Sequence, residues 1–378
     1  MTRDLDATGT AGSPFAELAI TRLHLQDIPD CIDIARRSFD YFNGDASAVE
    51  NWFDARISNN PWQRALDGIG LGVRDRGHLI AFRAMFAQPW WIDGRSTVIA
   101  FAAHTCVEAG HRGCGLGGKM IAKSRDSSDL TGSTTAGNIT QSVYTKLGFI
   151  AVGGEGNNFY RARASYVGSV QSRLGSALGQ AVGPAFDVIS IGRERRLGGY
   201  RDFRLENLAS CSDEFDELWA RAKSGYASCL ERSSRYLNWR LFDFPTYPLS
   251  LVSLRDAKDR LRGYGIWHEL RYSEHVSCAV LRDLFVANDD EEGRSAFMTL
   301  IMPYWRRMGI TWVSLEVASD RLTRLFAAQG YEPIPSNGNR YHVYRTQALS
   351  RMTLDGWLRS GLDGDYFDTR PRGTSNEE

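Results

Sequence analysis

The chain has 378 residues, of which 43% are hydrophobic and 24% are charged. This length exceeds that of a typical single domain, so we expect at least two domains with ample core material. Its 45 basic and 45 acidic residues cancel, which removes the basic field that a nucleic-acid or anionic-membrane partner would need. Neither partner is expected, and the oligomeric state is left open.

The cysteines are scattered, without a C-x-x-C pair or a histidine cluster at metal-ligand spacing, at Cys31, Cys106, Cys114, Cys211, Cys229 and Cys278. We interpret them as reduced thiols and expect neither a disulfide framework nor a metal site. Residues 1–16 are polar and predict a disordered start without a secretory signal. No run reaches the roughly 20 apolar residues of a membrane span. A cytoplasmic, soluble protein is the expectation.

The first half of the chain predicts alternating strands and helices. Hydrophobic periodicity and turn residues place strands at 18–23, at 71–86 on both sides of a turn at 75–77, on the approach to a turn at 93–94, and at 98–107. A capped helix is predicted at 31–39. Residues 131–135 make a poor strand by composition.

The apolar run at 98–107 stops in a glycine-rich loop and is followed by a helical turn from Lys119. Glycine allows a backbone to approach a ligand closely, and the unpaired N–H groups of a first helical turn point outward. The sequence therefore predicts a site for a phosphate or pyrophosphate.

Residues 113–118 also fit G-x-G-x-x-G, the pattern of dinucleotide-binding folds. Such a fold requires an acidic residue about 20 positions further on, at the end of the next strand. Asp126 and Asp129 come too early. The dinucleotide interpretation is therefore the weaker one.

Two motifs in this region point to a different ligand. Arg112 begins an R-x-x-G-x-G pattern, and Asn138 is followed by Tyr144 in an N-x5-Y-x-x-x-G-F segment. Together they resemble the coenzyme A loop and the tyrosine segment of the GCN5-related N-acetyltransferases. The resemblance implies an α/β fold with a mixed, mostly antiparallel sheet and acetyl-CoA, or another acyl-CoA, as co-substrate. The residues implied to bind it are Cys106, Val107, Arg112, Gly113, Cys114, Gly115, Leu116, Gly117, Gly118, Lys119 and Asn138.

The second half repeats the order of elements seen in the first. Between the halves, an apolar repeat predicts an amphipathic linker helix that ends near Gly183 and Pro184. After it come a strand at 200–205, a helix, a hairpin, a strand, two helices around a further strand, and then Gly330-Tyr331, which mirrors Gly148-Phe149. We predict tandem acetyltransferase-like domains with these limits: disordered N-terminus 1–16, catalytic domain 17–164, linker helix 165–199, degenerate second domain 200–346 and C-terminal tail 347–378.

The two copies are not equivalent at the positions of the motifs. Four consecutive acids, at 289–292, stand where the first half has its glycine loop, and they would repel a pyrophosphate. Phe326 stands where the first half has Tyr144, so the phenol is missing. We expect only the first domain to bind CoA.

Acyl transfer from a thioester requires attack by a neutral amine and protonation of the leaving thiolate. The resemblance implies that Tyr144 is the general acid, whereas a packing role at a helix end is the alternative. His104 is a candidate base because imidazole titrates near neutrality, but it lies on the pleat opposite Val107 unless a bulge intervenes, and a core histidine is equally consistent. Glu108, His111 or a water molecule could serve instead.

Residues 234–245 are similar to a segment of other tandem acetyltransferase-like proteins. Arg235, Trp239 and Arg240 could receive an acidic or sugar acceptor, or they could form a cation–π and ion-pair clasp within the second domain, which we favour.

The predicted function is acyl-CoA-dependent N-acylation of a small amine, such as an amino sugar or a specialised-metabolite amine. A non-catalytic CoA-binding or scaffold protein is one alternative. A FemABX-like aminoacyl transferase is another, although binding tRNA would require a basic surface that this neutral chain lacks.

Overall fold

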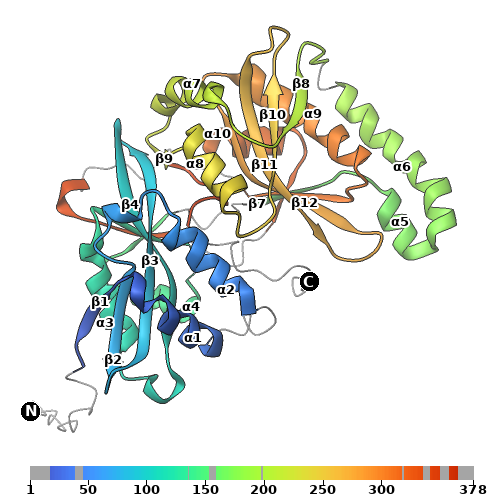
Figure 1. Ribbon diagram of the computed structural model, residues 1–378. Coiled ribbons are helices and arrows are strands. Elements are labelled where there is room, and N and C mark those ends of the chain that lie inside the picture. The colour runs from blue at the N-terminus through green and yellow to red at the C-terminus, as the bar shows by residue number, and fades with distance from the viewer. Residues whose placement is uncertain are drawn as a thin grey trace, which may run out of the picture.

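The computed structural model describes residues 18–38, 46–134, 136–152, 159–196, 199–316, 319–334, 341–349 and 357–364. Two lobes make up the molecule, each with a mixed sheet flanked by helices (Figure 1). No helix within these residues is long and apolar enough to cross a membrane.

The two sheets have the same strand order and the same strand directions. The first sheet runs β1 (Ile20–Leu23), β2 (Gly70–Asp75), β3 (His78–Ile92), β4 (Arg95–Val107), β5 (Leu130–Ser133), β15 (Tyr341–Arg345) and β6 (Ile150–Val152). The second runs β8 (Arg204–Leu208), β10 (Ser250–Arg255), β11 (Leu261–Arg271), β12 (Ser277–Val286), β13 (Trp312–Leu315), β7 (Phe159–Arg163) and β14 (Glu332–Ile334). Along each order only the fourth and fifth strands are parallel. This correspondence agrees with the tandem architecture predicted from the sequence.

Each sheet contains a strand from the other half of the chain. β7 precedes the linker yet pairs with β13 and β14, whereas β15 comes from the second half and lies between β5 and β6. In addition, β9 (Ser228–Leu230) pairs with the far end of β3, and β16 (Trp357–Leu358) pairs with β9. The consecutive limits 17–164 and 200–346 did not anticipate this exchange. The two halves are therefore interlocked by main-chain hydrogen bonds.

Helices cover both faces of the first sheet. α1 (Ile28–Ser38) and α2 (Ala46–Phe53) lie on one face, and α3 (Leu116–Ser124) and α4 (Asn138–Lys146) lie on the other. Neighbouring residues of β3 alternate between the faces, since Phe82 packs in the core with Trp52 of α2 whereas Ala81 packs with Leu116 of α3. The second sheet is flanked by α7 (Asp213–Ala222), α8 (Ser234–Asn238), α9 (Glu291–Arg307) and α10 (Asp320–Ala328).

The linker contains two helices, α5 (Val167–Leu174) and α6 (Ser176–Arg196), and not one that ends near Pro184. The break falls at Gly175, whose φ of 86° is left-handed, and Pro184 lies inside α6. Gly179 and Gly183 face α5 so closely that a Cβ atom would lie 2.2 Å from Gln171 and 2.6 Å from Val167. Gly179 and Gly183 thus allow α5 and α6 to pack against each other.

Two further predictions about elements were wrong, and the strand that was poor by composition is present. The strand from 78 and the strand approaching 93–94 are one continuous strand, β3. The weak segment at 131–135 contributes a true strand, β5, in which Gly132 is required because a Cβ atom would lie 2.7 Å from the Phe101 ring. The strand expected at 200–205 lies later, as β8.

Candidate functional site

An opening in the first sheet separates β4 from β5. The two parallel strands pair only at Ala100–Thr131 and Phe101–Gly132. Beyond this point β4 contains a bulge, because its register with β3 passes from Ala84–Ala103 to Phe82–Cys106. The bulge holds His104 at a φ of 46°, an uncommon conformation for a residue other than glycine. The strands thus diverge at Phe101, which leaves β4 without a β5 partner along its last residues.

The glycine loop joins the end of β4 to α3. Gly113 and Gly115 have left-handed φ angles of 84° and 79°, and Gly115 is the N-cap of α3 without any side-chain cap. The Lys119 amide is the first of the helix to bond back, to the Gly115 carbonyl at 3.0 Å. The amides of residues 116–118 therefore have no partner within the helix, and this is the arrangement that binds anionic groups.

The predicted CoA-binding residues lie along this path, except Asn138, which begins α4. Leu116 and Cys106 are buried in the core, where burial raises the pKa of the Cys106 thiol well above its usual value. A Cβ atom on Gly117 would meet only Val107, at 4.0 Å. Arg112 is exposed, and its Nε donates to the Val107 carbonyl at 3.0 Å; Cys114 is half-buried and Lys119 is exposed. A Cβ atom on Gly118 would lie 3.8 Å from Val143. The structure describes nothing of the Asn138 side chain.

Tyr144 of α4 lies across the opening. Its ring is 1% exposed and stacks on His342 of β15 with the ring centres 5.1 Å apart, and His342 is paired with Ser133 of β5. On the other side, its hydroxyl accepts a hydrogen bond of 2.9 Å from Nη2 of Arg83 on β3. Nη1 of Arg83 donates to Thr105 of β4 at 2.7 Å. The phenol is thereby held between the two diverging strands.

Sequence reasoning missed Arg83 and Thr105. A signal existed for Arg83, since it is the one charged residue in the apolar run from 79 to 87. A lone arginine in such a run must find hydrogen-bond acceptors when the strand is buried.

His104 lies on the opposite face of the sheet from Tyr144. Its ring packs edge-on against Trp52 of α2, with the ring centres 4.3 Å apart, and the residue is buried. The bulge that was the condition for its access is present, but His104 still lies on the face opposite Val107, which packs with Leu116 of α3. His104 and Tyr144 therefore border the same opening from opposite faces.

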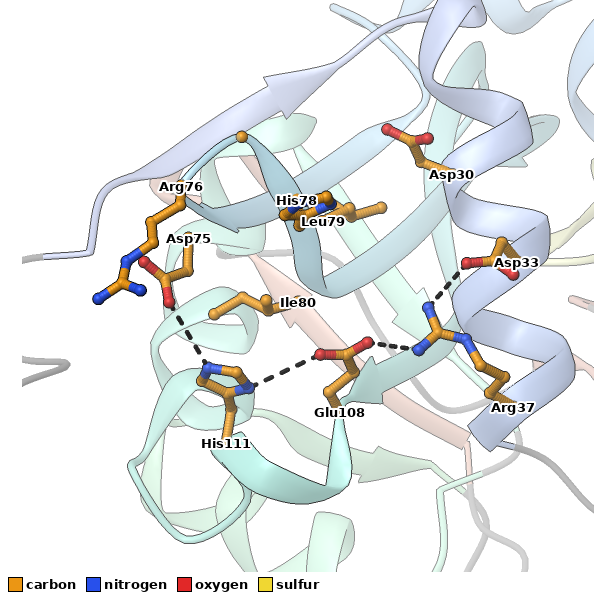
Figure 2. A pocket seen from close by; sticks show the side chains of 11 residues that line it. Asp30, Asp33, Arg37, Asp75, Arg76, His78, Leu79, Ile80, Glu108 and His111 are labelled. Carbon is orange, nitrogen blue, oxygen red and sulfur yellow. Dashed lines mark hydrogen bonds and ion pairs between the residues drawn. The ribbon is translucent and has the colours of Figure 1, made fainter.

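The other two candidate bases line a polar cavity at the turn between β2 and β3. Glu108 accepts a hydrogen bond of 2.6 Å from Arg37, and His111 lies 3.8 Å from Glu108 and 4.0 Å from Asp75 (Figure 2). The cavity has a volume of about 420 Å³. Both side chains are therefore held by polar contacts with neighbouring residues of this cavity.

The corresponding opening in the second sheet is filled by the chain itself. β12 and β13 pair from Cys278–Trp312 to Leu281–Leu315, and β12 then bulges at Arg282. The Arg282 carbonyl accepts a hydrogen bond of 2.7 Å from the Gly361 amide, and the Arg282 guanidinium pairs with Glu316 at the end of β13. The segment 357–364, which we call the C-terminal segment, therefore occupies this opening.

The first turn of α9, unlike that of α3, is capped by a side chain. The Asp290 carboxylate caps it by accepting from the Gly293 amide at 2.8 Å, and Arg262 holds that carboxylate with bonds of 2.7 and 2.8 Å. Phe326 of α10, fully buried, packs against Tyr160 of β7 where Tyr144 packs against His342 in the first half. The second half thus lacks both the uncapped amides and the phenol.

The residues predicted to receive the acceptor form a clasp between the halves. Trp239 is 2% exposed and lies under the Arg56 guanidinium at 5.2 Å, and Arg235 lies over Trp62 at 5.0 Å. Arg240 donates to the Gly364 carbonyl at 3.3 Å. These cation–π contacts join the first half to the second, whereas the favoured prediction placed them within the second domain.

Among the residues that the structure describes, no group of three or more histidine, cysteine or acidic side chains could hold a metal ion. No protein-family model and no curated protein matches the sequence.

Comparison with solved structures identifies the architecture. A GCN5-related N-acetyltransferase from Anabaena variabilis matches with a TM-score of 0.56 and 17% identity, covering 86% of this chain and 72% of that one. A probable N-acyltransferase from Enterococcus faecalis matches with a TM-score of 0.54 and 9% identity, covering 87% and 72%. A GCN5-related N-acetyltransferase from Kribbella flavida matches with a TM-score of 0.53 and 17% identity, covering 88% and 72%. The chain therefore has the fold of the GCN5-related N-acetyltransferases.

Proposed function

We propose that this protein transfers an acyl group, in the first instance acetyl, from CoA to a small amine in the cytoplasm. The observation that carries the proposal is the opening between β4 and β5 together with the uncapped first turn of α3 at its end. A pantetheine arm could lie along the unpaired edge of β4 while the amides of 116–118 hold the pyrophosphate. The similar solved proteins named as N-acetyltransferases support this choice of chemistry.

Tyr144 is the proposed general acid, and His104 is the proposed base or the residue that orients a water molecule serving as base. The amine nitrogen attacks the thioester carbonyl, the carbon–sulfur bond breaks, and the phenol protonates the departing sulfur. The proton lost by the amine leaves through His104 or water and finally restores the phenol. Both side chains border the opening, one on each face of the sheet, so a thioester in the opening would lie between them.

The second half is proposed to shape the acceptor site without binding CoA. The C-terminal segment fills its opening, and Asp290 caps α9 where a pyrophosphate would lie. Within the clasp, Arg235 is exposed and could contact an acceptor directly. Trp239 and Arg240 are buried and would support the acceptor site without touching the acceptor.

The test is thiol release from acetyl-CoA, with propionyl-CoA and longer acyl-CoAs as a chain-length series, against a panel of amino sugars and small diamines. We expect amine-dependent release of free CoA and an acylated amine by mass spectrometry. One CoA per chain is expected by calorimetry. Binding without release in any combination would favour the non-catalytic alternative, and two CoA molecules per chain would contradict the division between the halves.

A further inference from the structure

Arg83 is a buried cation in the first half. It is 1% exposed, and it donates from Nη2 to Tyr144 at 2.9 Å, from Nη1 to Thr105 at 2.7 Å and from Nε to Ser124 at 3.2 Å. All three acceptors are neutral hydroxyl groups. In the part of the chain that the structure describes, no carboxylate lies within ion-pair distance of Arg83.

Two buried arginines of the second half, Arg232 and Arg282, are paired with acids. Arg232 forms two bonds of 2.9 and 3.0 Å with Asp283, both fully buried, and Arg282 at the second bulge pairs with Glu316. Burying a charge without a counter-charge costs several kcal/mol in general, because water no longer solvates it. Within the described residues, the cation beside the open cleft thus has no counter-ion, whereas Arg282 at the closed cleft is paired with Glu316.

The hydrogen-bond chemistry of arginine fixes the direction of the Tyr144 proton. A guanidinium can only donate, so the Tyr144 oxygen accepts from Arg83 and keeps its own proton free to donate elsewhere. Among the described residues, Arg83 is the one hydrogen-bond partner of that hydroxyl. Since no described side chain accepts the Tyr144 proton, that proton is available to a group bound where β4 and β5 diverge.

We propose that Arg83 is a positioning residue that aims the Tyr144 proton at the thioester sulfur and stabilises the phenolate formed when that proton is transferred. This inference rests on the proposed function. In this step the carbon–sulfur bond breaks, its electron pair goes to sulfur, and the Tyr144 proton is transferred to that sulfur. The negative charge then resides on the phenol oxygen, 2.9 Å from Nη2 of Arg83, until the proton released by the amine returns.

A double-mutant cycle tests the proposal. Thiol release from acetyl-CoA, to an amine or to water, is measured for wild type, Arg83→Met, Tyr144→Phe and the double variant. We expect Arg83→Met to lower kcat by about 10- to 10³-fold in the wild-type background and by less than about threefold in the Tyr144→Phe background. Arg83→Lys, which retains the charge, should recover part of the rate.

Arg56→Met is the matched control, because it also removes an arginine that is 1% exposed, but one whose guanidinium lies over Trp239 and not beside the phenol. Its effect on kcat should be the same in both backgrounds. Equal losses for Arg83→Met in the two backgrounds, or an unchanged kcat, would overturn the proposal.

A binding measurement separates failure of this inference from failure of the proposed function. The affinity of CoA is compared with that of desulfo-CoA, which lacks only the sulfur, by calorimetry. We expect wild type to prefer CoA, and Arg83→Met and Tyr144→Phe to lose the preference while retaining affinity for desulfo-CoA. If wild type shows no thiol release but the preference behaves in this way, the inference stands and the proposed reaction fails. A preference unaffected by Arg83→Met contradicts the inference whether or not turnover is observed.

Discussion

In each half of the molecule a pair of parallel strands diverges beside a bulge, after Phe101 in the first half and after Leu281 in the second. In the first half the next helix begins with an uncapped glycine turn. In the second half a carboxylate caps the next helix, and the C-terminal segment bonds to the bulge through Gly361. The comparison teaches that one architecture can serve as a ligand cleft or as a structural joint, depending on what fills its opening.

The joint in the second half also connects the lobes. Leu362 and Gly364 of the C-terminal segment bond to the side chain of Gln88 on β3, the Nε2 donating to the Leu362 carbonyl at 3.3 Å and the Oε1 accepting from the Gly364 amide at 3.1 Å. The segment thus begins at the second sheet and ends against the first. The same eight residues therefore close the second opening and join the two lobes.

The largest effect is expected at the loop that distinguishes the two openings. Gly117→Glu should abolish acetyl-CoA binding, because it places a carboxylate among the amides proposed to hold pyrophosphate. The fold should survive, since the new Cβ atom has room. Ala209→Glu, an exposed substitution on the second lobe with the same charge, is the control and should bind normally in calorimetry. Unchanged affinity of Gly117→Glu would remove the loop from the site.

The two aromatic residues at equivalent positions give the next prediction. Tyr144→Phe should lower kcat by about 10²- to 10⁴-fold, the range for loss of a general acid, with little change in affinity for desulfo-CoA. Phe326→Tyr, which adds a phenol to the second half, should leave kcat unchanged because no thioester lies near it. A Tyr144→Phe variant with nearly normal turnover would assign the phenol to packing.

The sequence was sufficient to predict the duplication and the glycine loop at the end of β4, because both leave local signals. The glycines that need left-handed φ angles and the acids at 289–292 lie in short contiguous stretches. The exchange of β7 and β15 leaves no such signal, since a strand pairs equally well with either of two similar sheet edges. The contacts of Arg83 and of the C-terminal segment were missed because the partners are far apart in the sequence. Arg83 and Tyr144 are separated by 61 residues, and Gln88 and Gly364 by 276 residues.

A smaller effect, on stability, is expected at the closed opening. Trp357 of β16 is buried and packs edge-on against Trp90 of β3 with the ring centres 4.8 Å apart. Trp357→Ala should lower the free energy of unfolding by about 3–5 kcal/mol, the usual cost of removing a buried tryptophan. Tyr272→Ala, which removes an exposed ring, should change it by about 0.5 kcal/mol at most. Urea unfolding followed by fluorescence measures both, and equal small losses would mean that the segment is not required for the fold.

The smallest effect concerns the pH range over which the C-terminal segment stays in place. Asp363 is fully buried, and burial together with the nearby Asp283 raises the pKa of its carboxyl to about 7, although Arg232 and bonds from Ser360 oppose the rise. Arg232 is already engaged by two bonds to Asp283, so it offers little compensation to a second carboxylate.

The sign of the pH dependence follows from this shift. In the unfolded chain the Asp363 carboxyl ionises near its ordinary pKa of about 4, so between about pH 4 and pH 7 the folded protein holds a proton that the unfolded chain has lost. The stability contributed by the neutral carboxyl is complete below pH 4, falls through this window and is absent above pH 7. Asp363→Asn, which stays neutral and can still accept from Ser360, should therefore have a Tm about 2–8 °C above wild type at pH 8 and close to it at pH 4. Asp202→Asn, at an exposed position, should follow wild type at both values. Parallel Tm curves for wild type and Asp363→Asn from pH 4 to pH 8 would show that this carboxyl does not titrate in the window, and that the second opening is closed equally well over the whole range.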